Sequence, residues 1–317
     1  MKIKSKSVLF FLIVFVLIFL STNCVSATEH TPILVTQTST GGSVNSQSTN
    51  PSTSADGRYV AYESYATNLG TGSSGSGIQD IYVYDSQTNT TEWITQTPTG
   101  GAANGNSYSP SISGDGRYVA FVSQATNLGP GGSGNGIKDI YVYDRELDVM
   151  KWITHDPDGG PASNSSNLPV ISADGTTLAF QSTAKNLGSG GSEYYVSDIY
   201  LYDLTNTDPD YCPEWITQTS EGKTANGASM DPSISADGRY IAFETVATNL
   251  GSNPYIRYGT GDGVRDIFVY DRTLGSMSWI TSIGSVTIGA DNLGGPFSTP
   301  FYVDLSMNAD GTIYWGY

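Results

Sequence analysis

Residue types that often carry catalysis are scarce in this chain of 317 residues. Its two histidines are His30 and His155, and it contains neither the H-E-x-x-H motif of zinc proteases nor the G-x-S-x-G motif of serine hydrolases. His155 stands beside Asp156 and Asp158, and such a trio could form one corner of a metal site. One histidine with two carboxylates is more common in a solvated loop, so we expect no metal site here and no enzyme activity.

Glycine-rich motifs of the form G-x-G-x-x-G occur at 70–75 and at 129–134. Such a loop cradles a phosphate when a helix follows it, because the first amides of the helix point at the anion. Neither copy is followed by residues with a helical period. We therefore interpret both segments as flexible connections.

The dominant signal is an internal repeat. The segment 56–70, DGRYVAYESYATNLG, returns with few changes at 115–129, 174–188 and 237–251. The hexapeptide DIYVYD follows each copy in the same or a closely similar form, and a W-I-T tripeptide follows the hexapeptide. Self-similarity at a regular spacing is the signature of a repeat architecture.

Each unit has the pattern of four short strands, described here for the second copy. They are expected at 110–113, 117–123, 139–144 and 152–154. Between the first two strands, Asp115-Gly116 predicts a tight turn, because glycine accepts a positive φ and aspartate bonds to its own turn. No segment after Ala27 has a sustained helical period, so we expect an all-β fold.

The second and third strands of each unit are apolar on both faces. In DIYVYD, the isoleucine and valine point one way and the two tyrosines point the other. A sheet buried on both faces must lie between two others, and sheets packed between copies of themselves form a propeller. A two-layer sandwich would need one polar face in each strand. We therefore predict a β-propeller of four-stranded blades with four complete repeats.

A fifth blade is predicted from the two chain ends. Residues 308–311 resemble the tight turn of the other units, and 312–317 would be the strand after it. Near the N-terminus, Ile33–Thr38 matches the fourth strand of a unit. The two ends together would close the ring. This blade lacks a third strand in the sequence, so either it has three strands or the chain is a shortened version of a larger propeller.

The pattern P-S-I-S-A-D-G-R-Y-V-A-F followed by D-I-Y-V-Y-D resembles the WD40-like repeat of TolB-type propellers, often called PD40. The resemblance covers nearly all of the chain after residue 27, although the link between the second and third strands is longer than in the usual family unit. It implies a propeller fold. It also implies a role like those of known members, which include periplasmic and cell-surface protein-binding modules and non-catalytic domains of some peptidases.

The first residues have the pattern of a secretory signal peptide. Lys2, Lys4 and Lys6 precede the unbroken apolar run 8–20, and Val25-Ser26-Ala27 ends the segment with small residues. We predict a signal peptide at 1–27 and a single propeller domain at 28–317, secreted or held at the cell surface or in the periplasm. The alternatives are an uncleaved anchor, and lipid attachment at Cys24, which the bulky Asn23 before it disfavours.

The net charge restricts the classes of partner, and the cysteine content restricts the possible disulfides. The net charge of −16 would repel phosphate backbones, so nucleic acid is a poor partner. Loss of residues 1–27 removes Cys24 and leaves Cys212 alone, so no intrachain disulfide can form. We expect a monomer that binds a protein or a glycan at the cell envelope.

Comparison among the copies separates folding from function, because a residue present in every blade serves what every blade needs. Three such sets are expected to be structural. They are the turn residues Asp56, Asp115, Asp174 and Asp237, the strand-capping residues Asp80, Asp139, Asp198 and Asp266, and the tryptophans Trp93, Trp152, Trp215 and Trp279. We expect the capping aspartates to bind backbone amides and the tryptophans to pack the fourth strand against the next blade.

The long connections of all blades should crowd one rim, and two of them depart from a bland Gly, Ser and Asn composition. Tyrosine and arginine are frequent at binding surfaces, so these two loops from consecutive blades predict a ligand-binding patch. Its residues are Glu193, Tyr194, Tyr195, Tyr255, Arg257, Tyr258 and Asp262. The alternative is that both loops fold over the rim and shield strand edges.

From these observations we expect a non-enzymatic binding or scaffold propeller without a cofactor. Calcium is possible at Asp262 and Asp266, which supply hard oxygen ligands. One alternative is a polysaccharide-active lyase or hydrolase on the same fold. Its base or carboxylate pair would have to break the repeat in the first strands near the central channel, where Asp231 is the candidate. Another alternative is a structural element of the cell envelope.

Overall fold

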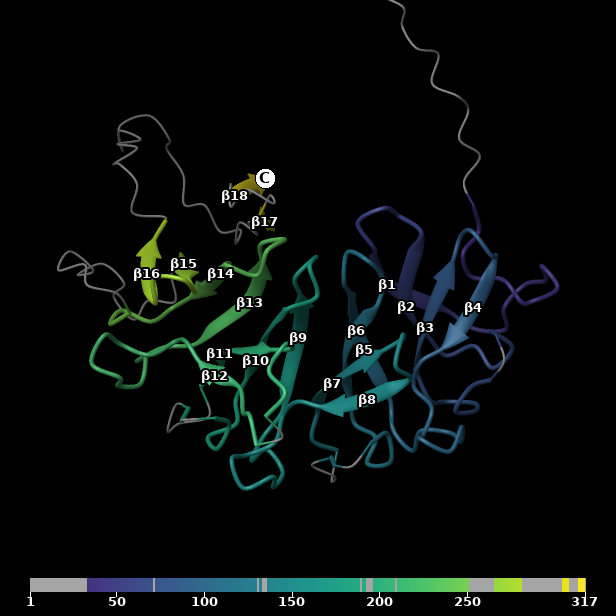
Figure 1. Ribbon diagram of the computed structural model, residues 1–317, viewed down its shortest axis with the longest axis horizontal. Helices are drawn as coiled ribbons and strands as arrows, with labels where there is room; N and C mark the ends of the chain where they lie inside the picture. The colour runs from purple at the N-terminus through teal and green to yellow at the C-terminus, as the bar shows by residue number, and fades with distance from the viewer. Residues whose placement is uncertain are drawn as a thin grey trace, which may run out of the picture. The chain divides into compact units, whose positions relative to one another are not determined.

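The computed structural model describes residues 33–70, 72–129, 131–132, 136–188, 190–191, 196–208, 210–250 and 265–280, and the backbone of 304–307 and 313–316. Every regular element in these ranges is a strand (Figure 1). The same ranges contain no apolar helix of membrane-spanning length. The described residues from Val35 onward form one compact unit, and the predicted signal peptide lies outside the described residues.

The four repeats fold as four antiparallel sheets, each with its four strands in sequence order. The first two sheets contain β1 (Ser48–Thr53), β2 (Tyr59–Ser64), β3 (Asp80–Asp85), β4 (Thr90–Trp93), β5 (Ser107–Ile112), β6 (Tyr118–Ser123), β7 (Asp139–Asp144) and β8 (Val149–Trp152). The other two contain β9 (Ser166–Ile171), β10 (Thr177–Ser182), β11 (Asp198–Asp203), β12 (Glu214–Trp215), β13 (Ser229–Ile234), β14 (Tyr240–Thr245), β15 (Asp266–Asp271) and β16 (Ser276–Trp279). The all-β propeller class and its four complete blades are thereby confirmed.

The first strand of each blade begins earlier than predicted. In the second blade, β5 starts at Ser107 and not at Pro110, because the polar residues before the proline also pair with β6. Each first strand carries a β-bulge with one residue in the left-handed region. These residues are Asn50, Ser109, Leu168 and Asp231, with φ of 50°, 50°, 50° and 52°. Since every blade has this kink, it belongs to the fold.

The predicted Asp-Gly turns are confirmed as structural. Asp115 Oδ1 accepts hydrogen bonds from the Ser113 hydroxyl at 2.5 Å and from the Arg117 amide at 2.9 Å. Gly116 has a φ of 76°, and a Cβ added there would lie 2.1 Å from the ring of Tyr59 in the preceding blade. Glycine is required at this position both by the turn and by the close approach of the neighbouring blade.

Adjacent blades pack an aromatic face on an aliphatic face. Between the first and second blades, Phe121 and Tyr141 lie in one cluster with Ile81 and Val83. The two rings of the second blade stack with centroids 6.0 Å apart. The opposite face of the same strands, with Ile140, joins the cluster shared with the third blade. The prediction that both faces are buried is therefore correct.

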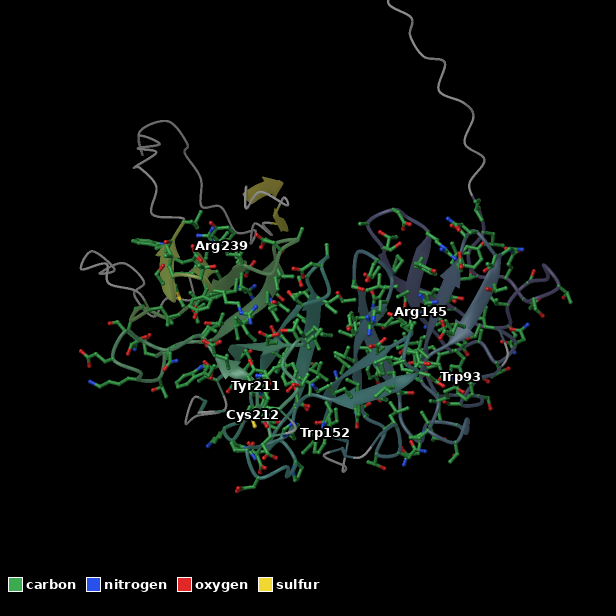
Figure 2. The ribbon with its side chains drawn as sticks, in the orientation of Figure 1. Trp93, Arg145, Trp152, Tyr211, Cys212 and Arg239 are labelled. Atoms are coloured by element: carbon green, nitrogen blue, oxygen red, sulfur yellow. The ribbon has the colours of Figure 1, made fainter. Side chains whose placement is uncertain are left out.

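The tryptophans face the side opposite to the one predicted. Trp215 lies with Tyr200 in the cluster shared with the second blade, whereas Ile216 lies in the cluster shared with the fourth. Successive side chains of a strand point to opposite faces, so the isoleucine packs on the next blade. Figure 2 marks the corresponding tryptophans of the first two sheets, Trp93 and Trp152.

Of the aspartates that open the third strands, Asp80, Asp139 and Asp198 are buried and Asp266 is half-buried. Their carboxylates bind more than backbone amides. In the first blade, Asp80 accepts the Ser74 amide at 2.7 Å, as predicted, and also the Thr95 hydroxyl at 2.6 Å. Asp139 of the second blade likewise accepts the Thr154 hydroxyl at 2.8 Å. These carboxylates therefore tie the third strand to the residues that follow the fourth.

The chain ends support part of the fifth-blade prediction. Strands β17 (Asp304–Met307) and β18 (Ile313–Gly316) pair in the antiparallel sense, and the predicted turn at 308–311 lies outside the described residues. Val35 and Val44 pack on the aromatic face of the first blade, as Ile94 and Ala103 pack on that of the second. Val35 thus packs on the first blade as a residue of a fourth strand would, whereas Ile33 and Leu34 are exposed. The described bridge of the segment Ile33–Thr38, Gln37 with Ser43, is local, and ring closure remains a prediction.

Candidate functional site

The ligand-binding patch predicted from the sequence lies outside the described residues. This holds for Glu193, Tyr194, Tyr195, Tyr255, Arg257, Tyr258 and Asp262. The patch therefore stays a prediction. Of the two possible calcium ligands, Asp266 is described, and one of its carboxylate oxygens accepts the indole N–H of Trp279 at 3.2 Å.

The first strands of successive blades contact one another, and their N-terminal halves lie at the end of the sheets where the long loops attach. Backbone hydrogen bonds join the blades there. Ser107 N–H donates to the Gln79 carbonyl at 2.8 Å. Ser166 and Ser229 make the same bond to Lys138 and Ser197 at 2.8 and 2.7 Å. The copies therefore share one backbone geometry at this end.

Side chains at this end differ from blade to blade, although the backbone repeats. The fifth residue of the second strand is Glu63, Val122, Gln181 or Glu244 in the successive blades. The residue before the third strand is Gln79, Lys138, Ser197 or Arg265. We name the polar side chains gathered here the inner-edge cluster. It consists of Glu63, Tyr108, Gln124, Lys138, Gln181, Asp231, Glu244 and Arg265.

Glu63 joins the first two blades. It is 5% exposed, and its carboxylate accepts the Thr49 hydroxyl at 3.0 Å and the Asn50 amide nitrogen at 2.8 Å. Its second oxygen accepts the backbone N–H of Ser109 in the next blade at 2.7 Å. Because every bond comes from a kinked first strand, Glu63 holds the kinks of both blades in position.

An aromatic ring and a cation meet in the second blade. Tyr108 donates its hydroxyl to Gln124 Oε1 at 2.9 Å. The Lys138 ammonium lies 5.2 Å from the centroid of the Tyr108 ring. All three side chains are half-buried, so they combine an apolar surface with groups that can form hydrogen bonds.

Two carboxylates share one arginine in the fourth blade. Arg265 Nη1 lies 2.7 Å from Glu244 Oε2 and 3.9 Å from Asp231 Oδ2. The side chain of Glu244 is 15% exposed and that of Asp231 is 50% exposed. Gln181 of the third blade accepts the Asp231 backbone N–H at 3.0 Å. Asp231, singled out from the sequence, is therefore accompanied by a second acid.

Glu244 and Arg265 were not predicted as site residues, because Glu244 lies within a segment that otherwise repeats closely and Arg265 directly precedes another such segment. The available signal was their departure from Val122 and Gln181, or from Lys138 and Ser197, at the same positions in other copies. That signal becomes informative only when the residues are known to converge at one edge of the sheets.

His155 and its neighbours lie in a loop that is closed by hydrogen bonds to Asp156. Asp156 Oδ1 accepts the Gly160 and Asp158 amides at 2.6 and 3.1 Å, and the His155 ring lies 5.8 Å from that of Trp152. Within the described ranges, no three His, Cys, Asp or Glu side chains are grouped closely enough to hold a metal ion.

No protein-family model and no curated protein sequence match the chain. Among solved structures, TolB from Acinetobacter baumannii matches with 21% identity and a TM-score of 0.42 over 74% of this chain and 43% of TolB. The β-propeller domain of the Trilobed protease from Pyrococcus furiosus matches with 16% identity and a TM-score of 0.43 over 74% of this chain and 57% of that chain.

Oligogalacturonate lyase from Vibrio parahaemolyticus matches with 12% identity and a TM-score of 0.48 over 85% of this chain and 58% of the lyase. The present chain thus spans less than half the length of the Acinetobacter TolB chain. These neighbours share a fold and differ in activity. The four-stranded sheets of this chain fit the WD40-like (PD40) blade that the repeat predicts.

Proposed function

We propose that this protein is an exported binding propeller, which holds a protein or glycan at the inner-edge cluster and catalyses no reaction. The segment 1–27 supports export, to the cell surface, the periplasm or the medium. The acidic charge supports a partner other than nucleic acid. The protein acts as a monomer without a metal cofactor.

One observation carries this proposal. At the long-loop end of the sheets, four first strands repeat the same kink while Glu63, Val122, Gln181 and Glu244 replace one another at one position. A rigid frame whose side chains at one position differ between neighbouring blades is suited to a ligand with an asymmetric set of groups. At the opposite end, the Asp-Gly turns repeat in every blade.

The predicted loop patch would extend this surface. Its tyrosines offer both a ring face and a hydroxyl, which suits a sugar or a peptide, and Arg257 would select an anionic group. Under this proposal, Tyr255→Ala and Tyr258→Ala weaken ligand binding and leave thermal stability nearly unchanged.

A paired binding screen tests the proposal. The protein lacking residues 1–27 is applied to a glycan array and to purified envelope proteins, beside a variant with Tyr108→Ala, Lys138→Ala and Gln181→Ala. The control is Leu274→Ala, since Leu274 is 70% exposed in the turn between β15 and β16. We expect the triple variant to lose a ligand that the control retains. Equal binding by both variants would contradict the location of the site.

Asp231 and Glu244 favour a second candidate function. Two carboxylates on one arginine near the central strands could supply the acid and base of a polysaccharide lyase or hydrolase. Incubation with plant and bacterial oligosaccharides, followed by chromatography, tests this. Shortened products that disappear in the Asp231→Asn variant would replace the binding proposal with an enzyme.

A further inference from the structure

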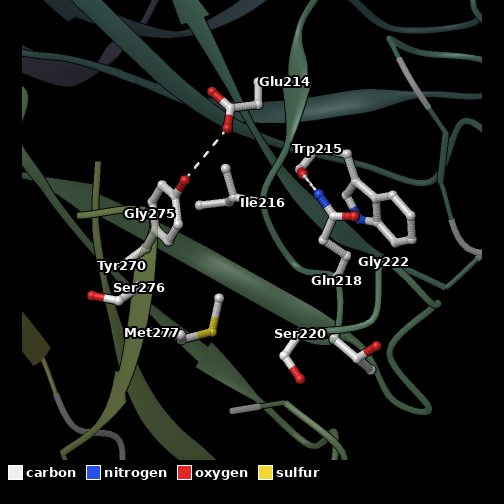
Figure 3. A pocket seen from close by; sticks show the side chains of 11 residues that line it. Glu214, Trp215, Ile216, Gln218, Ser220, Gly222, Tyr270, Gly275, Ser276 and Met277 are labelled. Carbon is white, nitrogen blue, oxygen red and sulfur yellow. Dashed lines mark hydrogen bonds between the residues drawn. The ribbon is translucent and has the colours of Figure 1, made fainter. Parts of the chain in front are cut away.

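An open groove lies along the outer edges of the third and fourth blades, apart from the inner-edge cluster. Its volume is about 550 Å³. The third blade contributes Glu214 and Gln218, and the fourth contributes Tyr270 and Met277. Figure 3 shows Glu214 beside the Tyr270 hydroxyl at one end of the groove and Ser220 at the other. A volume of this size accommodates a side chain together with the backbone that carries it.

The corresponding place between the first and second blades is filled by an arginine. Glu92 occupies the position of Glu214, before the tryptophan of the fourth strand. Arg145 of the second blade places Nε and Nη2 each 2.8 Å from Glu92 Oε2, and Nη1 donates to the Gly116 carbonyl at 2.6 Å. Its guanidinium also lies 4.4 Å from the centroid of the Tyr59 ring. This junction is therefore built around a guanidinium.

A cation also lies between the second and third blades. Lys151 takes the position of Glu92, and its ammonium lies 4.8 Å from the centroid of the Tyr202 ring. The ring of Tyr211 packs edge-on against Tyr202 at 4.9 Å, and burial lowers the pKa of Lys151. Both preceding junctions thus enclose a basic side chain of the protein itself.

Arg272 of the fourth blade corresponds to Arg145 but lies elsewhere. Its Nη2 is 2.6 Å from Asp203 Oδ2, and its Nη1 donates to the Thr177 hydroxyl at 2.8 Å. Both partners belong to the third blade. The arginine that would complete the junction is therefore held by a carboxylate other than Glu214.

Two adjacent differences in the third blade, at Thr176 and Thr177, explain the change. In the other blades, an arginine after the Asp-Gly turn pairs with the last aspartate of the third strand. These pairs are Arg58 with Asp85, Arg117 with Asp144, and Arg239 with Asp271. The third blade has Thr176 in place of that arginine, so Asp203 takes Arg272 from the next blade. Thr177, where other blades have tyrosine, leaves space for this contact.

Glu214 is left as an exposed carboxylate at the groove. It accepts the Tyr270 hydroxyl at 3.4 Å, and no lysine or arginine among the described residues pairs with it. At the first junction the corresponding carboxylate, Glu92, is covered by Arg145, whose side chain is only 16% exposed. The third junction therefore keeps the acidic half of the Glu92–Arg145 arrangement without its basic half.

We propose that the groove between the third and fourth blades is a second binding site, which takes an arginine side chain presented by a partner protein. The guanidinium of the partner would pair with the Glu214 carboxylate through two N–H groups, as the guanidinium of Arg145 pairs with Glu92 at the first junction. The net charge of −16 favours the approach of a basic segment. This site does not depend on the inner-edge cluster, so either can fail without the other.

Methionine methyl NMR with a minimal probe tests the site. The full chain carries ¹³C-labelled methionine methyls, and the probe is N-acetyl-arginine methylamide. The matched compound is N-acetyl-citrulline methylamide, which has the same shape without the charge. We expect the Met277 methyl resonance to shift and saturate with the arginine compound, while Met150 at the second blade stays unchanged. Equal shifts with the citrulline compound would overturn the proposal.

Two variants separate the carboxylate from the shape of the groove. Glu214→Gln should weaken the arginine probe at least fivefold, whereas Glu92→Gln should leave the Met277 response unchanged. An unchanged response in Glu214→Gln would contradict the role of the carboxylate.

Thr176→Arg closes the groove without altering any residue that lines it. The new arginine pairs with Asp203 and releases Arg272 to Glu214, so we expect probe binding to be lost. Thr176→Ala is the matched control and should bind the probe as the wild type does, because Arg272 stays on Asp203. If Thr176→Arg binds the probe normally, the proposed cause of the open groove is wrong.

Discussion

The second and third blades have the same four strands and the same Asp-Gly turn, but they hold the end of the third strand differently. Asp144 of the second blade pairs with Arg117 of its own turn at 2.7 Å. Asp203 of the third blade pairs with Arg272 of the following blade at 2.6 Å. One blade is closed within itself, and the other depends on its neighbour.

This difference shows that when a repeat loses an arginine by substitution, a cation from the next repeat can take its place. The exchange still changes the surface between the two repeats. The sheet keeps its shape because a carboxylate needs a cation, whichever blade supplies it. Because Arg272 pairs with Asp203, it does not pair with Glu214. A groove therefore remains at the junction of the third and fourth blades. Departures from a repeat therefore have to be followed through their contacts to the next unit.

The largest effect is expected at the turn of the second blade. Gly116→Ala places a methyl group 2.1 Å from the Tyr59 ring at a φ of 76°, so we expect a loss of about 3 kcal/mol of unfolding free energy. Gly57→Ala has a similar φ of 70° and nothing within 4 Å of the added Cβ, so it should cost about 1 kcal/mol. Urea denaturation measures both, and equal losses would show that contact between blades is unimportant there.

The next effect tests the dependence of the third blade on the fourth. Arg272→Gln removes the cation from Asp203, and we expect a loss of about 1 to 2 kcal/mol of unfolding free energy. In a Thr176→Arg background the same change should cost much less, since Asp203 then has a partner in its own blade. A double-mutant cycle from four denaturation curves gives the coupling. If the effects of the two substitutions on unfolding free energy are additive, Asp203 does not depend on Arg272 in the way proposed.

A dependence on pH should follow from the same pair. Burial raises the pKa of Asp203, but hydrogen bonds from Thr205 and Arg272 outweigh it and hold the pKa below the ordinary value of 3.8. A carboxyl group with a depressed pKa stabilises the fold above its unfolded value and loses that contribution as the pH falls through the folded value.

Stability should therefore be steady from neutral pH to about pH 5 and decline in more acidic solution. The decline should be shallower in Arg272→Gln, whose Asp203 has a pKa closer to the ordinary value. Denaturation midpoints measured across this range check the prediction. Identical curves for the two proteins would show that Asp203 does not contribute to acid unfolding.

The smallest effect is expected for Thr176→Ala. Arg272 already satisfies Asp203, and the Thr176 hydroxyl bonds only to the nearby turn residues Asp174 and Thr177. We expect a change within about 0.5 kcal/mol in unfolding free energy. A larger loss would mean that the threonine has a role of its own in the turn.

The sequence by itself determined the all-β class, the number of complete blades, the third strands and the Asp-Gly turns. Those features are local, because turn chemistry and the alternation of side chains act between residues close in the chain. It did not reveal the start of the inner strands, since residues such as Ser107 and Ser109 are polar and show no apolar alternation. The same omission concealed the inner-edge cluster.

Only the tertiary structure decided which blade each side chain serves. The alternation of side chains along a strand predicts that Trp215 and Ile216 point to opposite faces. Only the packing of the blades showed that Ile216 is the one that contacts the next blade. Arg272 and Asp203 are 69 residues apart, and nothing in the local sequence links them. The open groove arises because pairing of charges depends on distance in space, and that distance is set when neighbouring blades pack together.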